Sequence, residues 1–254
     1  MIPKERQSRI LRALQEEGRV EIDSLATNLS VSPMTIRRDL GMLEERGECI
    51  RTHGGAVLTK LNITETPYMT KESQHLFEKR MIAEEAVRWV RDVSTILLDS
   101  GTTTLEIAKR LPEDHTLTVI TNDVRIAAYL VDTHHHVIVT GGELQQKVGA
   151  LFGPLTEQLL RDIHVELFFM GAHAIHPDAG ITAPTIEKAK LKHLMIHAAE
   201  QTWVVADSSK FQQKSFAKVC DLNEVNGVLT NSVHDLEWVR EQTEVRLPTR
   251  GDVS

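Results

Sequence analysis

Residues 32–43 combine an apolar stripe with polar side chains of the kinds that contact DNA bases. The segment reads S-P-M-T-I-R-R-D-L-G-M-L, and its opening Ser-Pro pair is typical of a helix start. Ile36, Leu40 and Leu43 recur at i, i+4 and i+7, which predicts one face packed against a core. The N-terminal turns of such a helix are those that a recognition helix presents to the major groove. The side chains that we expect to contact DNA there are Ser32, Met34, Thr35, Arg37 and Arg38.

The flanking sequence predicts a winged helix-turn-helix around this segment. Two further helices are expected over residues 4–17 and 23–29, and a short loop separates the second of them from the recognition helix. Residues 48–57 read E-C-I-R-T-H-G-G-A-V, which predicts two strands joined by a Gly-Gly turn. Such a hairpin would carry Arg51 and His53 towards phosphates beside the recognition helix.

A second group of small or polar residues follows the strand-like runs in the rest of the chain. Five apolar runs end in D-S-G-T-T-T, T-N-D, T-G-G-E, the single glycine Gly171, and D-S-S-K. In an open parallel sheet the carboxyl ends of the strands form the ligand crevice, so these ends predict one polar pocket. The residues expected to line it include Asp99, Gly101, Thr102, Thr103, Thr104, Thr121, Asn122, Gly141 and Gly142.

The first of these loops, residues 99–104, has the composition of an anion-binding loop. A glycine and three threonines stand between a strand and a helix, whose N-terminal amides and dipole favour an anion. A phosphate would also find hydroxyl donors there. The loop is neither a Walker A loop nor a dinucleotide-binding G-x-G-x-x-G motif. A tight turn capped by threonine would explain the same residues, and the spacing to the other four polar ends is what favours a binding site.

The elements that must hold these loops alternate regularly after residue 94. Strand-length apolar runs occur at residues 95–98, 117–120, 137–139, 167–170, 203–205 and 228–229. Helix-like stretches occur at residues 105–111, 124–131, 154–161, 186–197 and 233–242. Strands buried on both faces and alternating with helices predict an α/β domain with a mostly parallel sheet.

These patterns divide the chain into three segments. Residues 1–57 are expected to form the winged helix-turn-helix domain and residues 75–254 the α/β domain. Residues 58–74 lack clear periodicity and include Pro67, which predicts a linker. A helix is expected to follow, over residues 72–91.

Charge is distributed unevenly between these segments. The chain has 254 residues and a formal net charge of −7. Residues 1–60 hold 10 Lys/Arg and 9 Asp/Glu, a balance of +1, whereas the remainder holds 19 and 27, a balance of −8. Nucleic-acid binding is therefore expected only in the N-terminal part, where it must rest on the local placement of the arginines.

Composition also narrows the class of protein. No apolar run approaches the ~18 residues of a membrane span, and the charged N-terminus does not read as a signal peptide. The two cysteines show no CxxC spacing, so we expect reduced thiols in a cytoplasmic protein. The histidines at 134–136 and the pair His193 and His197 lack the further ligands of a metal site, so we expect neither a metal nor a cofactor.

The N-terminal residues resemble the winged helix-turn-helix of the DeoR family of bacterial transcriptional regulators. The resemblance is carried by T-I-R-R-D-L at residues 35–40 and R-T-H-G-G-A at residues 51–56, and it continues along the chain to Phe211. It implies a sequence-specific repressor whose C-terminal domain senses a phosphorylated sugar or a related metabolite.

The second part of the chain resembles the DeoR sensor domain, which is related in fold to ribose-5-phosphate isomerases. The family's D-x-G-T-T, T-N, G-G, F-x-G and D-S-S-K-F elements stand at residues 99–103, 121–122, 141–142, 169–171 and 207–211. The resemblance implies that Lys210 is a point charge for the effector's phosphate or carboxylate, and that Glu187 with Lys190 lines the opposite wall. Residues 172–187 depart from the commoner pattern of the family, which leaves the effector unidentified.

Two other functions fit parts of the sequence. A sugar-phosphate isomerase needs a positioned carboxylate base, for which Glu143, Asp178 and Glu187 are available, but the Asp-Glu cluster of the related isomerases is not seen. A DNA-binding oligomer with a vestigial pocket is the other alternative. We expect a non-enzymatic repressor of a carbohydrate-catabolic operon that binds double-stranded operator DNA as a homo-oligomer, because one winged helix buries too little surface for typical specific affinity.

Overall fold

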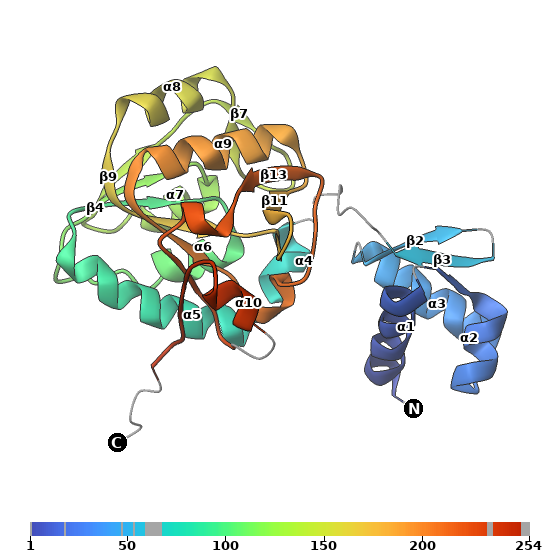
Figure 1. Cartoon of the computed structure of the whole chain (residues 1–254). Coiled ribbons are helices and arrows are strands. Elements are labelled where there is room, and N and C mark those ends of the chain that lie inside the picture. The colour runs from blue at the N-terminus through green and yellow to red at the C-terminus, as the bar shows by residue number, and fades with distance from the viewer. Residues whose placement is uncertain are drawn as a thin grey trace. The chain divides into compact units, whose positions relative to one another are not determined.

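Two stretches of the chain, Met1–Thr66 and Pro67–Ser254, form separate units in the computed structural model (Figure 1). The structure describes residues 2–17, 19–46, 48–52, 54–58, 68–232 and 236–249. None of the helices within these ranges is long and apolar enough to cross a membrane.

The first unit is a winged helix-turn-helix, as predicted. Its elements are α1 (Pro3–Glu17), β1 (Arg19–Glu21), α2 (Ile22–Leu29), α3 (Pro33–Glu45), β2 (Cys49–Thr52) and β3 (Gly55–Leu58). Helix α3 begins as the sequence indicates, because the Ser32 side chain accepts a hydrogen bond of 3.2 Å from the Thr35 amide and Pro33 occupies the first turn. The strands form an antiparallel sheet in the order β1-β3-β2, in which β2 and β3 are the expected hairpin.

The predicted apolar stripe of α3 forms the core of this unit. Ile36, Leu40 and Leu43 are fully buried, and they share one cluster with Ile10 and Leu14 of α1. Full burial of side chains of this size contributes about 1.5–3 kcal/mol each. The recognition helix is therefore held by its apolar side, and its opposite side stays in solvent.

A buried ion pair reinforces this contact between α1 and α3. Asp39 of α3 is only 1% exposed, and its carboxylate pairs with the guanidinium of Arg6 from α1. Arg6 Nη2 and Gln7 Nε2 donate to Asp39 Oδ1 at 3.2 and 3.3 Å. Because a buried carboxylate is tolerated only when it is paired and hydrogen-bonded, these contacts fix the angle between the two helices.

The second unit is built on a seven-stranded parallel sheet. In chain order its strands are β4 (Thr95–Leu98), β5 (Thr118–Thr121), β6 (His136–Val139), β9 (Val165–Gly171), β12 (Ala199–Val205), β14 (Gly227–Leu229) and β15 (Glu244–Arg246). They lie in the order β15-β14-β12-β9-β4-β5-β6, and every neighbouring pair is parallel. The six predicted strands all form, which confirms the α/β class, and β15 is an additional edge strand.

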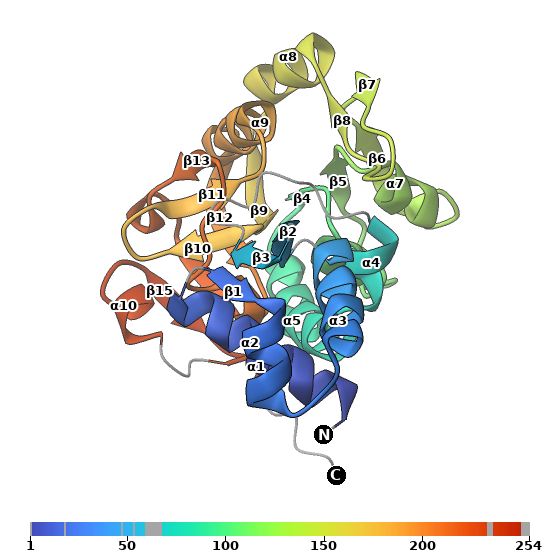
Figure 2. The same cartoon turned by 90° about the vertical axis from the view of Figure 1, so that its right-hand side faces the viewer.

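Helices cover both faces of this sheet (Figure 2), because alternate residues of each strand point to opposite sides. The helices are α4 (Tyr68–Ser73), α5 (Leu76–Trp89), α6 (Thr102–Ala108), α7 (Val124–Leu130), α8 (Pro154–Asp162), α9 (Ile186–His197) and α10 (Glu237–Arg240). Helices α5, α6 and α7 share a cluster with Ile96 and Leu98 of β4, whereas α9 shares the other cluster with Leu97 and Phe168.

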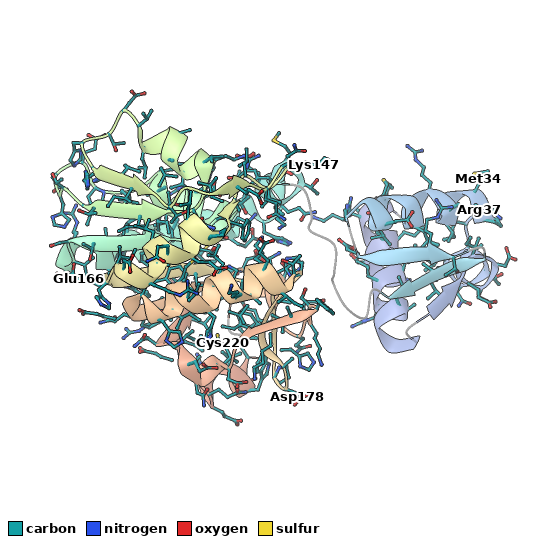
Figure 3. All side chains as sticks on the ribbon, turned by 90° about the horizontal axis from the view of Figure 1, so that it is seen from above. Met34, Arg37, Lys147, Glu166, Asp178 and Cys220 are labelled. Atoms are coloured by element: carbon teal, nitrogen blue, oxygen red, sulfur yellow. The ribbon has the colours of Figure 1, made fainter. Side chains whose placement is uncertain are left out.

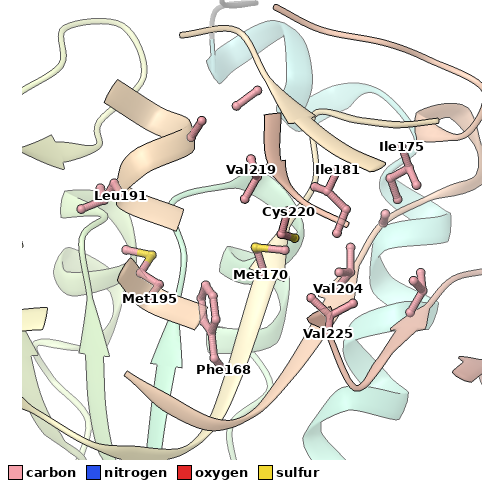
Figure 4. Packing of buried hydrophobic residues seen from close by; sticks show 14 of the residues in the cluster. Phe168, Met170, Ile175, Ile181, Leu191, Met195, Val204, Val219, Cys220 and Val225 are labelled. Atoms are coloured by element: carbon pink, nitrogen blue, oxygen red, sulfur yellow. The ribbon is translucent and has the colours of Figure 1, made fainter. Parts of the chain in front are cut away.

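Two small antiparallel sheets were not expected from the sequence. Their strands are β7 (Glu143–Leu144), β8 (Leu151–Phe152), β10 (Ala174–His176), β11 (Gly180–Ala183) and β13 (Ala217–Cys220). The sheet β10-β11-β13 packs with α9 over the large sheet, and Figure 4 shows Ile181, Val219 and Cys220 meeting Met170 beside Met195 of that helix. Each strand has only two to four residues, which is too short for a periodic pattern to show.

The junction between the units also differs from expectation. The helix expected over residues 72–91 is two helices, because α4 ends at Ser73 and His75 has a positive φ of 52° before α5 begins. Strand β3 and helix α4 occupy the two ends of the segment that we expected to be a linker. Residues 59–67 of that segment, and residues 233–235 of the last expected helix, lie outside the described residues.

We expect the Asp39→Ala variant to destabilise the first unit by about 3–5 kcal/mol, because it leaves the guanidinium of Arg6 buried without its counter-charge. Circular dichroism during urea denaturation of the full chain measures this loss. Asp23→Ala, which removes an exposed carboxylate from α2, is the matched control and should change the free energy of unfolding by less than about 0.5 kcal/mol. Equal stability of the two variants would contradict the structural role of the pair.

Candidate DNA-contact surface and effector site

Helix α3 presents its predicted contact residues to solvent. Met34 is 69% exposed, and Arg37 and Arg38 are also exposed. Figure 3 shows the side chains of Met34 and Arg37 on this unit. Thr35 is partly exposed, and its hydroxyl lies 2.9 Å from that of Ser32, so these two side chains also close the N-terminus of the helix. The exposed side of α3 therefore offers two guanidinium groups and one flexible apolar side chain to a ligand.

The hairpin supplies one more cation beside this helix. Arg51 of β2 is exposed, and its backbone amide donates to Glu44 Oε1 of α3 at 3.0 Å. This hydrogen bond holds the hairpin against the C-terminal part of α3. His53, which we expected at the tip of the wing, lies outside the described residues.

In the second unit, a buried carboxylate joins the ends of two adjacent strands. Asp99 follows β4 and is 2% exposed, and its Oδ2 accepts a hydrogen bond of 3.1 Å from the amide of Gly171 at the end of β9. Lys192 of α9 forms an ion pair with Asp99 and donates to the Gly171 carbonyl at 2.7 Å. The sequence analysis missed Lys192, although it stands between Ala189 and Met195 on the buried stripe of α9, where a lysine is unusual.

The loop that follows Asp99 uses much of its hydrogen-bonding capacity internally. Thr104 Oγ1 donates to the carbonyls of Asp99 and Gly101, at 2.6 and 2.9 Å. The Gly101 amide, which we expected to face an anion, donates instead to Asp123 Oδ2 at 3.2 Å. The Thr104 hydroxyl thus stabilises the turn through its carbonyls, no side chain caps the helix start, and Thr102 and Thr103 are buried. The role of the loop in binding stays a prediction.

The end of β5 lies next to this loop and contains an unpaired acceptor. Thr121 Oγ1 donates to the carbonyl of Leu98 at 2.8 Å, so this side chain joins two strands. Asn122 is fully buried, and its Nδ2 donates to the Leu151 carbonyl at 3.4 Å. Its Oδ1 is buried and has no hydrogen-bond partner in the described part of the chain, so it can accept from a ligand.

Asp123, the next residue, is fully buried and caps α7. Its Oδ1 accepts from the amides of Arg125 and Ile126, at 2.7 and 3.4 Å. Burial raises the pKa of Asp123 to about 6, although these amides and that of Gly101 favour the charged form. The sequence analysis did not single out this residue, and its position directly before a helix was the available signal.

The two glycines after β6 have a structural reason to be glycines. Gly141 and Gly142 have φ values of +72° and +104°, which L-residues rarely adopt. A Cβ on Gly142 would lie 2.0 Å from the carbonyl oxygen of Phe152, so β8 approaches this backbone closely. The Gly141 carbonyl also accepts from the Thr156 hydroxyl at the start of α8. Gly141 and Gly142 thus hold the β7–β8 hairpin close to the carboxyl end of β6.

Lys210 lies in a charged cluster after β12. It closes a short turn, Ser208–Lys210, that begins with Asp207, whose Oδ1 accepts from the Ser209 amide at 3.0 Å. Asp207 Oδ2 is buried and unpaired among the residues described here. Burial alone would raise the pKa of Asp207, but the charge of Lys210 and the hydrogen bonds from Ser209 hold it below its ordinary value. A cation and a free carboxylate oxygen thus stand together at this strand end.

A second lysine, Lys79 near the start of α5, interacts electrostatically with this cluster. Lys79 is 3% exposed, and its ammonium group donates to the carbonyl of Gln74 at 2.6 Å and also to that of Lys71. Burial lowers the pKa of Lys79 to about 8, while the charge of Asp207 opposes this shift. Sequence reasoning missed this residue because the apparent continuous helix concealed the turn that it closes.

Glu187 and Lys190, which we expected to line the wall opposite Lys210, have different surroundings. Glu187 is exposed in the first turn of α9, whereas Lys190 donates to both carboxylate oxygens of Glu157 on α8 at 2.7 Å. Lys190 therefore serves helix packing. Within the described residues, no group of three or more His, Cys, Asp and Glu side chains is placed to hold a metal ion.

Comparison with known proteins finds similarity along most of the chain. A family model described as a DeoR-like helix-turn-helix domain matches residues 6–61, and one described as the DeoR C-terminal sensor domain matches residues 74–232.

Relatives with assigned names match over nearly their full length. The HTH-type transcriptional regulator GlpR of Haloferax volcanii is 36% identical over 244 residues, which cover 96% of this chain and 95% of that protein. The lactose phosphotransferase system repressor of Staphylococcus epidermidis is 32% identical over 237 residues, which cover 92% and 93%. Among solved structures, ribose 5-phosphate isomerase A of Methanocaldococcus jannaschii aligns with a TM-score of 0.39 and 18% identity, over 52% of this chain and 53% of that one.

The raised pKa of Asp123 predicts a pH dependence of stability that Asp123→Asn removes. The folded pKa of about 6 exceeds the ordinary value of 3.8, so this group stabilises the fold fully below pH 3.8 and loses that contribution as the pH rises through 6. A pKa difference of this size corresponds to about 3 kcal/mol at most.

Urea denaturation at several pH values between 4 and 7 measures this effect. Relative to Asp123→Asn, the wild type should gain up to about 3 kcal/mol on going from pH 7 to pH 4. Asp132→Asn, at an exposed aspartate, is the matched control and should leave the pH profile unchanged. A constant difference between wild type and Asp123→Asn at all pH values would contradict the prediction.

Proposed function

Because the chain belongs to the DeoR family of transcriptional regulators, we propose that it represses a carbohydrate-catabolic operon and leaves its operator when a phosphorylated sugar or sugar acid binds. The family models and the relatives make the chain a DNA-binding regulator and not an enzyme. A relative named as the repressor of a lactose phosphotransferase system supports the link to carbohydrates. Operator DNA lies in the prokaryotic cytoplasm, which is where we propose that this regulator works.

The exposed side of α3 is the surface that we propose to read the operator. Arg37 and Arg38 are the guanidinium groups of its N-terminal half, and such groups bind guanine edges or phosphates. Met34 extends from the same turns and has the apolar character that a thymine methyl group contacts. Arg51 on the hairpin would add a phosphate contact. We further propose a homo-oligomer on a palindromic or repeated operator, because a single module of this size buries little DNA surface.

The observation that carries the effector proposal is the set of polar atoms left available at the carboxyl edge of the sheet. Lys210 supplies a cation for a phosphate or carboxylate. Asn122 Oδ1 and Asp207 Oδ2 are buried acceptors without partners in the described residues, and they suit the hydroxyl groups of a sugar. The edge would then be shaped by Thr102, Thr103, Gly141 and Gly142. None of these residues needs to convert the bound sugar chemically.

We expect Arg37→Ala and Arg38→Ala each to weaken binding to operator DNA. The loss should be about 1–3 kcal/mol where the arginine contacts a base, and the salt slope should fall by about one unit where it contacts a phosphate. Gel-shift titration at two salt concentrations, with the DNA that flanks the gene, separates these outcomes. Arg9→Ala, at an exposed arginine of α1 that pairs with Glu5, is the matched control. Unchanged affinity in both α3 variants would exclude α3 as the recognition helix.

Lys210→Ala is expected to give a repressor that holds its operator but no longer responds to the effector. An effector shifts the DNA-binding equilibrium only by its differential affinity for the two states, typically about 1–3 kcal/mol. The substitution removes a cation from the effector edge and leaves the first unit intact. Thr102→Ala should show a milder loss of response.

A reporter strain that carries each variant shows this behaviour as repression that cannot be relieved. Lys214→Ala, at an exposed lysine four residues further on, should be induced like the wild type. If Lys210→Ala instead lost repression while remaining folded, the proposed separation of DNA reading from effector sensing would be wrong.

A further inference from the structure

Tyr68 buries a hydroxyl group for which the described residues offer no hydrogen-bond partner. The residue is 3% exposed, and its Oη atom is inaccessible to solvent. Leaving a buried hydroxyl unpaired costs about 1–3 kcal/mol, and a phenylalanine would pack in the same space without that cost. Packing therefore explains the ring of Tyr68 but not its hydroxyl.

Contacts on both sides of the ring fix the position of the hydroxyl oxygen. The Arg125 guanidinium carbon lies 3.9 Å from the ring centroid, and the Tyr68 amide donates to the Lys147 carbonyl at 3.1 Å. On the apolar side, Tyr68 belongs to the cluster that contains Leu105 of α6 and Ile126 of α7. A donor that is fixed in advance binds a ligand with little loss of side-chain entropy.

The surroundings of the hydroxyl belong to the carboxyl edge of the sheet. Burial, together with the charge of nearby Asp123, raises the pKa of Tyr68, so the phenol keeps its proton and acts as a donor. Asp123 accepts a hydrogen bond from the Gly101 amide. The residue before it is Asn122, whose Oδ1 has no partner in the described chain. The Tyr68 ring lies against Arg125, whose amide donates to Asp123, so a donor and an acceptor without partners in the described chain both belong to the region that follows β5. Sugar hydroxyls and phosphate oxygens would satisfy both.

We infer that the Tyr68 hydroxyl donates a hydrogen bond to the bound sugar phosphate, so that the first described residue after the segment 59–67 is part of the effector site. This inference rests on the proposed function and deepens it. Residues 59–67 connect the DNA-binding unit to the sensor unit in the sequence. A ligand held by Tyr68 would contact the chain at the N-terminal end of the sensor unit.

The test is isothermal titration calorimetry of the full-length Tyr68→Phe variant. Glucose 6-phosphate, fructose 1-phosphate and ribose 5-phosphate serve as probes, with inorganic phosphate as a fourth. For each probe that the wild type binds, we expect Tyr68→Phe to raise Kd about tenfold, which corresponds to about 1.4 kcal/mol. Tyr129→Phe is the matched control, because Tyr129 is the other tyrosine of the chain and is 47% exposed on α7. Its Kd should equal that of the wild type.

The outcomes separate this inference from the proposed function. If the wild type binds a probe and Tyr68→Phe binds it equally well, the inference is overturned and the sensor function stands. If neither protein binds any probe, the sensor function fails and the inference fails with it. Thermal unfolding without ligand gives a second check, because removal of an unpaired hydroxyl should leave the midpoint equal or higher. A clear fall in the midpoint would show that the hydroxyl has a structural partner, such as a bound water, and would also overturn the inference.

Discussion

The buried ion pair between Asp99 and Lys192 fixes the edge of the sheet on which the effector site depends. Asp99 follows β4, Lys192 comes from α9, and both contact the backbone of Gly171 at the end of β9. Removing either charge from water alone costs several kcal/mol, so neither side chain is tolerated here without the other. Three elements that are distant in sequence are thereby joined at one carboxylate, and the loops that leave β4 and β9 start from defined positions.

The polar residues of this edge fall into two groups, according to whether their side chains find hydrogen-bond partners within the protein. Thr104 and Thr121 use their hydroxyl protons on backbone carbonyls, and these residues hold strand ends and turns together. Asn122 and Asp207 each keep one buried oxygen without a partner in the described chain. An unpaired buried acceptor is costly, so we propose that a bound ligand completes the hydrogen bonding of the second group. The motifs that mark the family in sequence contain both kinds.

The order of elements and the fold class were predictable because they rest on local patterns. Apolar residues at regular spacing predict burial, and the structure buries Ile36, Leu40 and Leu43 as well as the apolar strands. The partners of buried charges were not predictable, because the approach of Lys192 to Asp99 depends on how α9 crosses the sheet. The break at His75 was not predictable either, because this histidine adopts a left-handed conformation and neither a glycine nor a proline marks the position in the sequence.

Helix α4 is a short element that makes contacts near both of its ends. Its first residue, Tyr68, packs under Arg125 beside the end of β5. After the end of α4, the ammonium group of Lys79 in α5 donates to the carbonyls of Lys71 and Gln74. The negative charge of Asp207 favours the charged form of this lysine. An anion bound near Lys210 would favour the charged form of Lys79 and so strengthen the hydrogen bonds that close the α4–α5 turn. A ligand at this edge would therefore change the free energy of the α4–α5 turn, and a change of that kind is what linkage between the two sites requires.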